Sequence, residues 1–127
     1  MSAIQIGDSV TAIYKTGKYI GEVTDIRPEH YLVRILGVLK HPMQGDLHNP
    51  KQADVGFFHE RKALSCREQT NVPKTMVKHF DGEIPDYQES LKEAVEKLKD
   101  SLKADDSEWA SMSLRNIESL EQDYFKH

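Results

Sequence analysis

The chain has 127 residues and a formal net charge of −4 at pH 7. This length can bury one hydrophobic core without disulfides or a structural metal, and no run of residues approaches the roughly 18 apolar residues that cross a bilayer. The single cysteine excludes an internal disulfide and is typical of a reducing compartment. Because residues 1–7 also lack the pattern of an export signal, we expect a cytoplasmic protein.

Charge is divided unevenly between the two parts of the chain. Residues 86–127 hold 11 acidic and 6 basic residues, whereas residues 1–85 hold 10 acidic and 11 basic residues. Strong binding to a phosphate backbone requires a concentrated basic face. We therefore expect no nucleic-acid partner, although Lys15, Lys18 and Arg27 form a small local group of cations.

Residues 1–72 predict a small β module. Alternation of apolar and polar residues and the placement of turn residues predict five short strands, at 10–14, 19–26, 31–36, 55–60 and 63–68. The first two strands form a hairpin in which Gly17 supplies the positive φ of a tight turn. Five short strands joined in this way favour a strongly bent sheet, and an SH3-like small β-barrel is the simplest such architecture.

A long loop interrupts the β module between Lys40 and Asp54. It contains Pro42 and Gly45 and few large apolar residues. A loop of this length inside a compact domain is usually functional or mobile. We therefore expect this loop to take part in binding.

Residues 73–127 predict a linker and a C-terminal helical hairpin that packs on the barrel as one compact unit. Asp86 and Glu89 have capping-box spacing, and so do Asp105 and Glu108. Each pair precedes an apolar stripe with helical periodicity. The stripes consist of Tyr87, Leu91, Ala94, Val95, Leu98 and Leu102, and then Trp109, Met112, Ile117, Leu120 and Tyr124. Because the connection is short, the two helices are expected to be antiparallel.

Signatures of the common enzyme classes are missing from the sequence. It contains no Gly-rich phosphate loop, no dinucleotide fingerprint and no Gly-x-Ser-x-Gly motif. His41, Asp46 and His48 are potential zinc ligands in the long loop, but their spacing fits no strong pattern. We expect no metal and no cofactor, and a small metal-dependent hydrolase that uses these three residues is retained as an alternative function.

Cys66 is a second candidate for chemistry, with His59 as its nearest base in the sequence. A nucleophilic thiol needs such a base and a lowered pKa. In the strand predicted at 63–68, Cys66 shares its face with Leu64 and is expected to be inert packing in the core. We therefore expect no catalytic residues.

Aromatic residues concentrate in the β module. They are Tyr14, Tyr19, Tyr31, Phe57 and Phe58. SH3-like barrels use clustered aromatic rings to bind Pro-rich or methylated peptides, but strands also need such residues for their core. We expect about three of the five to serve as core. Phe57 and Phe58 are adjacent and point to opposite faces of a strand, so that one of them packs under the helices or is exposed to a partner.

Three stretches of the chain resemble the kinase-associated protein B family of spore-forming bacteria. The first is Gly7-Asp8-Ser9-Val10 with Tyr14-Lys15-Thr16-Gly17-Lys18-Tyr19-Ile20-Gly21-Glu22-Val23. The second is His41-Pro42 to Gly45-Asp46-Leu47-His48-Asn49-Pro50, and the third is Gly56-Phe57-Phe58-His59-Glu60-Arg61-Lys62-Ala63-Leu64. The helical tail also matches in length and character, so that the resemblance covers nearly the whole chain.

The resemblance implies a non-catalytic adaptor that supports a membrane sensor histidine kinase feeding the sporulation phosphorelay. Such a protein contacts the membrane only indirectly, through the kinase that recruits it to the inner face. The family has been described as lipoprotein-like, but Arg61 and Lys62 precede Cys66 where an export signal would have to lie, and we expect no lipid anchor. His48, Phe58 and Trp109 are the residues that we expect to bind the partner.

A second and more local resemblance is to Tudor-type barrels. It rests on Gly7-Asp8 with Val10, on Ala12 and Tyr14, and on Gly17-Lys18-Tyr19. This similarity implies recognition of methylated peptides or nucleic acid, which is the alternative to the adaptor function.

Overall fold

A five-stranded antiparallel sheet and a pair of helices form the regular structure of residues 3–45, 50–53 and 58–126, which this computed structural model describes. The elements are β1 (Ser9–Tyr14), β2 (Gly17–Ile26), β3 (His30–Lys40), β4 (Gln69–Pro73), a 3-10 helix η1 (Lys74–Met76), β5 (Val77–His79), α1 (Tyr87–Lys103) and α2 (Glu108–Tyr124).

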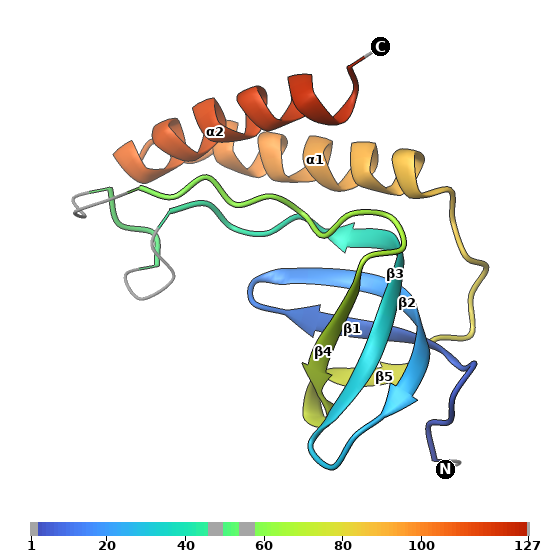
Figure 1. Cartoon of the computed structure of the whole chain (residues 1–127). Coiled ribbons are helices and arrows are strands. Elements are labelled where there is room, and N and C mark those ends of the chain that lie inside the picture. Colours follow the sequence, from blue (N-terminus) through green and yellow to red (C-terminus); the bar gives the residue numbers. More distant parts are fainter. Residues whose placement is uncertain (1–2, 46–49, 54–57, 127) are drawn as a thin grey trace.

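The strands form an SH3-like sheet in the order β4-β3-β2-β1-β5. Figure 1 shows that the sheet is strongly bent, and its two edge strands do not join to close a barrel. Three register shifts interrupt the pairing of β2 with β3. Irregularities of this kind increase the local twist and bend a strand, which explains the curvature. The predicted SH3-like fold is confirmed, and β3 is an interior strand paired on both sides.

The turn between β1 and β2 differs from its prediction in one respect. The residue with positive φ is Lys15, at 55°, and not Gly17. Gly17 is needed for a different reason, because a Cβ atom there would lie 2.6 Å from the hydroxyl oxygen of Tyr19. The glycine therefore makes room for a buried ring.

The strands predicted at 55–60 and 63–68 are wrong for the residues that the structure describes. Residues 58–65 are extended but belong to no strand, and Ser65–Glu68 form a turn in which the Glu68 amide donates to the Ser65 carbonyl (3.1 Å). Cys66 lies in this turn and is exposed, so its predicted place in the core is also wrong. The last two strands of the sheet instead follow the turn, and β5 lies beyond residue 72.

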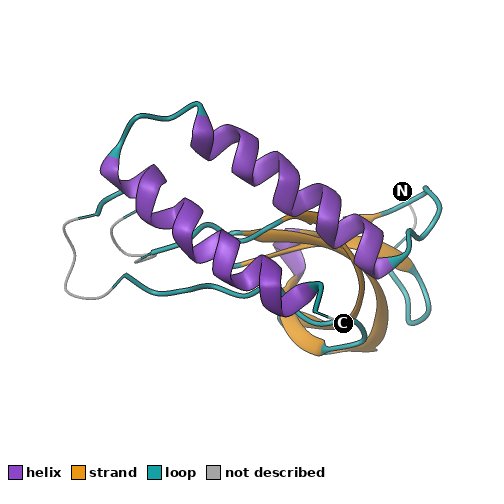
Figure 2. Cartoon of the chain, turned by 90° about the horizontal axis from the view of Figure 1, so that it is seen from above, coloured by secondary structure: helices purple, strands orange, loops and turns teal. Residues whose placement is uncertain are grey.

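Two antiparallel helices follow the sheet, as predicted (Figure 2). The Asp86 side chain caps α1 by accepting a hydrogen bond from the Glu89 amide at 3.1 Å. The cap of α2 is Ser107, which accepts from the Ala110 amide, and not Asp105 as its spacing predicted. Asp105 instead accepts from the Ser107 amide at 2.8 Å, which orders the residue that caps the helix.

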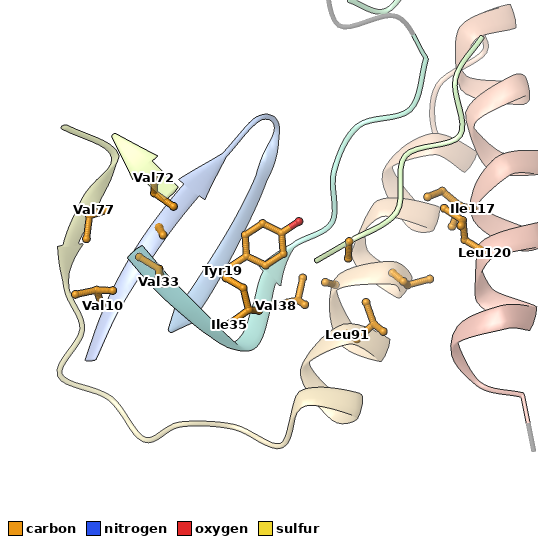
Figure 3. Close-up of a cluster of buried hydrophobic side chains, with 14 of the residues drawn as sticks. Val10, Tyr19, Val33, Ile35, Val38, Val72, Val77, Leu91, Ile117 and Leu120 are labelled. Atoms are coloured by element: carbon orange, nitrogen blue, oxygen red, sulfur yellow. The ribbon is translucent and has the colours of Figure 1, made fainter. Parts of the chain in front are cut away.

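One hydrophobic core joins the sheet to the helices. Figure 3 shows its side chains continuing from Val10, Val33, Val72 and Val77 in the sheet, through Tyr19, Ile35, Val38 and Leu91, to Ile117 and Leu120 on α2. Burial of apolar surface at this scale is the main favourable contribution to folding. The helices are therefore held by the same core as the sheet.

The close approach of α1 to β3 depends on Gly37. A Cβ atom at this position would lie 2.9 Å from Cγ of Pro85, just before the helix. Next to this contact, the Val38 amide donates a hydrogen bond to the buried Ser90 hydroxyl at 2.9 Å. The first turn of α1 is thereby fixed directly against the backbone of β3.

Candidate partner-binding surface

The connection between β3 and β4, which begins with the long loop, leaves the sheet and returns beneath the helices. Residues 41–45 run out and residues 58–65 run back beside them (Figure 1). Gln44 joins the two segments, because its side-chain amide donates to the Arg61 carbonyl (2.9 Å) and its side-chain oxygen accepts from the Arg61 amide (2.8 Å). The side chain of this buried glutamine thus makes hydrogen bonds between the two segments of the kind that backbone groups make between paired strands.

Three tyrosine hydroxyls hold the returning segment. Tyr19 from β2 accepts from the Leu64 amide, Tyr87 from α1 donates to the Leu64 carbonyl, and Tyr124 from α2 accepts from the Ala63 amide. Burial raises the pKa of Tyr19 to about 12 and also raises the pKa values of Tyr87 and Tyr124. All three hydroxyls are therefore protonated at neutral pH and act as neutral donors and acceptors.

A chain of hydrogen bonds fixes the protonation state of His41. Its Nδ1 lies 2.9 Å from the Pro42 carbonyl, which can only accept, so Nδ1 carries the proton. Nε2 then accepts from the hydroxyl of Tyr124, also at 2.9 Å. Burial lowers the pKa of His41, which agrees with this neutral tautomer.

The residues predicted to bind the partner occupy different environments. Trp109 is 6% exposed and its Nε1 donates to the Gln44 carbonyl, so it supports the loop from below the surface. Phe58 is half-buried, and its ring packs against Gly45. His48 lies outside the described residues. The binding role of all three stays a prediction.

The candidate metal ligands are not brought together by the described residues. His41 uses both ring nitrogens in hydrogen bonds, and Asp46 and His48 lie outside the described residues. The hydrolase alternative would need a nitrogen of His41 that the fold already uses.

The five aromatic residues predicted for the β module divide between core and surface where the structure describes them. Tyr19 is buried, whereas Tyr14, Tyr31 and Phe58 are half-buried, and Phe57 lies outside the described residues. Tyr14 and Tyr19 line one side of a cleft of about 230 Å³ between the β1–β2 turn and residues 60–64. The remaining lining residues are Lys15, Thr16, Pro42, Glu60, Arg61, Lys62 and Leu64. This cleft is a surface that the sequence did not predict.

Comparison with known proteins places this arrangement in a family. A sequence profile of the family described as Kinase associated protein B matches residues 14–125. The chain belongs to the kinase-associated protein B family. A relative from Bacillus subtilis (strain 168), Kinase-associated lipoprotein B, is 59% identical over 125 residues, which are 98% of this chain and 98% of the relative.

A solved member of the family has the same fold. The crystal structure of kinase-associated protein B from Bacillus cereus matches with a TM-score of 0.82 and 50% sequence identity, over 96% of this chain and 98% of the other. The resemblance predicted from the sequence is therefore confirmed. Within the described residues, neither helix combines the length and the apolar character that a membrane span requires.

Proposed function

We propose that this protein is a non-catalytic adaptor that supports a membrane sensor histidine kinase of the sporulation phosphorelay through direct contact. The observation that carries the proposal is membership of a family of kinase-associated proteins, with 59% identity to one member over nearly the full length. The adaptor works in the cytoplasm, and the kinase recruits it to the inner face of the membrane.

The proposed contact surface consists of the long loop, residues 40–54, and the adjoining helical surface. Gln44 near the start of this loop is bonded to Arg61, and Ala63 is bonded to the Tyr124 hydroxyl, so a partner that reaches these described residues would meet backbone that is fixed before binding. Preorganised surfaces lose less conformational entropy when they bind. His48 and Phe58 would contact the kinase, and Trp109 would position the loop through its hydrogen bond to Gln44.

The test is reconstitution of the kinase reaction. A sensor histidine kinase in inside-out membrane vesicles is incubated with labelled ATP, with and without the purified protein. We expect the protein to sediment with the kinase-containing vesicles and to increase phosphorylation, and to hydrolyse no ATP by itself. Equal sedimentation with vesicles that lack the kinase, or unchanged phosphorylation, would contradict the proposal.

The residue assignment is tested separately with His48→Ala, Phe58→Ala and Trp109→Phe. Thermal unfolding of each variant distinguishes loss of binding from loss of fold. Unchanged kinase binding in all three folded variants would remove these residues from the contact surface and leave the adaptor function in place.

A further inference from the structure

The cleft beside the β1–β2 turn combines segments that are far apart in the sequence. Tyr14 and Lys15 come from the end of β1 and the turn, and Arg61 and Lys62 come from the returning segment, residues 58–65. The hydroxyl of Thr16 in the turn accepts a hydrogen bond from the Met43 amide at 2.8 Å. The turn and the loop are therefore joined at the base of the cleft.

Cations dominate the charge of this cleft. Lys15, Arg61 and Lys62 line it, and Glu60 is the one acidic residue among the lining residues that the structure describes. The ion pairs found in the described part of the chain join Arg27 to Asp25, Arg34 to Glu22, His79 to Asp8 and Lys99 to Glu121. The three cations of the cleft thus pair with no carboxylate among the described residues.

The positions of two of these cations are constrained by the fold. Nε of Arg61 donates to the Gly45 carbonyl at 3.0 Å, and this hydrogen bond restricts the position of the guanidinium group. Nζ of Lys15 lies 5.4 Å from the ring centroid of Tyr14. Fixed cations beside an aromatic ring bind anionic side chains at a lower entropic cost than freely rotating lysines do.

Apart from Thr16 and Tyr19, the remaining described walls of the cleft are mainly apolar and small in extent. Tyr14, Pro42 and Leu64 contribute them, and the volume of about 230 Å³ suits one large side chain rather than a nucleotide. The occupant that matches these walls has carboxylates on either side of one apolar or aromatic residue. A nucleic acid would need a longer basic face than three cations provide.

We propose that this cleft binds an acidic extended segment of the protein partner, with one aromatic side chain inserted between Tyr14 and Leu64 and flanking carboxylates paired with Lys15, Arg61 and Lys62. This inference rests on the proposed function in that the ligand is part of a protein. The net charge of −4 on the whole chain does not oppose this binding strongly, because the cations are gathered locally at the cleft.

The test uses a synthetic peptide as probe, so that it requires no kinase. A fluorescein-labelled nonapeptide with four glutamates on each side of one phenylalanine is titrated with the full-length protein and followed by fluorescence anisotropy. Binding is expected at low salt, and raising NaCl from about 50 to about 500 mM should weaken it severalfold because salt screens exposed charges. A matched peptide with glutamine in place of glutamate should bind at least tenfold more weakly.

Single charge changes locate the site. Lys15→Glu and Lys62→Glu should each weaken binding about tenfold, and Glu60→Gln should strengthen it about two- to threefold. Lys78→Glu, which makes the same charge change on the exposed face of β5 and outside the lining of the cleft, is the matched control and should change affinity by less than about twofold.

Four results would overturn the proposal. They are no binding of the acidic peptide, equal binding of the glutamine peptide, equal effects of Lys78→Glu and Lys62→Glu, and displacement by inorganic phosphate at the same concentration as by unlabelled peptide. Because the peptide assay contains no kinase, its failure leaves the adaptor function standing. Failure of the reconstitution would likewise leave the peptide-binding cleft standing.

Discussion

The neutral imidazole of His41 links the loop to the end of α2 through Tyr124. A protonated ring could no longer accept a hydrogen bond at Nε2, so the Tyr124 hydroxyl would lose the acceptor that it has in the neutral state. Because burial lowers the pKa of His41 in the folded chain below its ordinary value of 6.5, the unfolded chain binds a proton that the folded chain excludes. The contribution of neutral His41 to the free energy of unfolding should therefore be complete above about pH 7. It should be lost progressively as the pH drops below about 6.5.

The slope of this dependence can be measured by urea unfolding at pH 7.5, 6.5 and 5.5. One excluded proton contributes at most about 1.4 kcal/mol per pH unit. In His41→Gln the free energy of unfolding should be lower at pH 7.5, but its decline below pH 6.5 should be shallower by this contribution. Parallel pH profiles for the two proteins would show that His41 does not titrate with unfolding.

The hydroxyl of Tyr124 serves two partners, the Ala63 amide and Nε2 of His41. Tyr124→Phe leaves both of them unsatisfied and should lower the free energy of unfolding by about 1–3 kcal/mol. Tyr31→Phe is the matched control, since the described residues show no hydrogen bond to its hydroxyl, and it should cost less than about 0.5 kcal/mol. Equal losses in chemical denaturation would contradict this assignment.

At the scale of elements, Ser107 and Asp105 are the two candidates for the residue that caps the N-terminus of α2. Ser107 accepts from the Ala110 amide, so Ser107→Ala should destabilise the protein by about 1 kcal/mol. Asp105→Ala removes only an exposed bond to the Ser107 amide and should have the smaller effect. The midpoints of urea unfolding at constant m-value decide between them, and a larger loss for Asp105→Ala would restore Asp105 as the cap.

The elements that the sequence predicted correctly are those in which local pattern and tertiary packing agree. Alternation in β1 and β2 and the helical periodicity of α1 and α2 each report directly which face is buried. The apolar run at Ala63 and Leu64 has the same local appearance as a strand. Its backbone is instead satisfied by the hydroxyls of distant tyrosines, and no periodicity in the run itself reports those partners.

The candidate site was less predictable than the fold. Phe58 and the long loop were recognisable from composition, but the cleft joins Lys15 to Lys62 across 46 intervening residues of sequence. Gln44 is one of several polar residues in the loop, and the residues beside it in the sequence do not indicate that it is buried. Which distant residues meet at the cleft is decided by the tertiary structure, and local sequence patterns do not report it.

At the scale of the whole molecule, the shared core predicts that the sheet and the helices unfold together. Trp109 is the only tryptophan and lies at the contact between α2 and the loop, so its fluorescence reports on that contact. Guanidinium unfolding followed by this fluorescence and by far-UV circular dichroism should give coincident midpoints. A fluorescence transition at clearly lower denaturant would show that the hairpin detaches from a folded sheet.

The contact of Gly37 with Pro85 also limits how the sequence of this protein can change. A side chain at position 37 would push away the start of α1, and with it the hydroxyl that receives the Val38 amide. Homologues that keep this arrangement should therefore retain a glycine here. Those that have lost it should carry a compensating exchange at the proline, so that the two columns of an alignment vary as a pair.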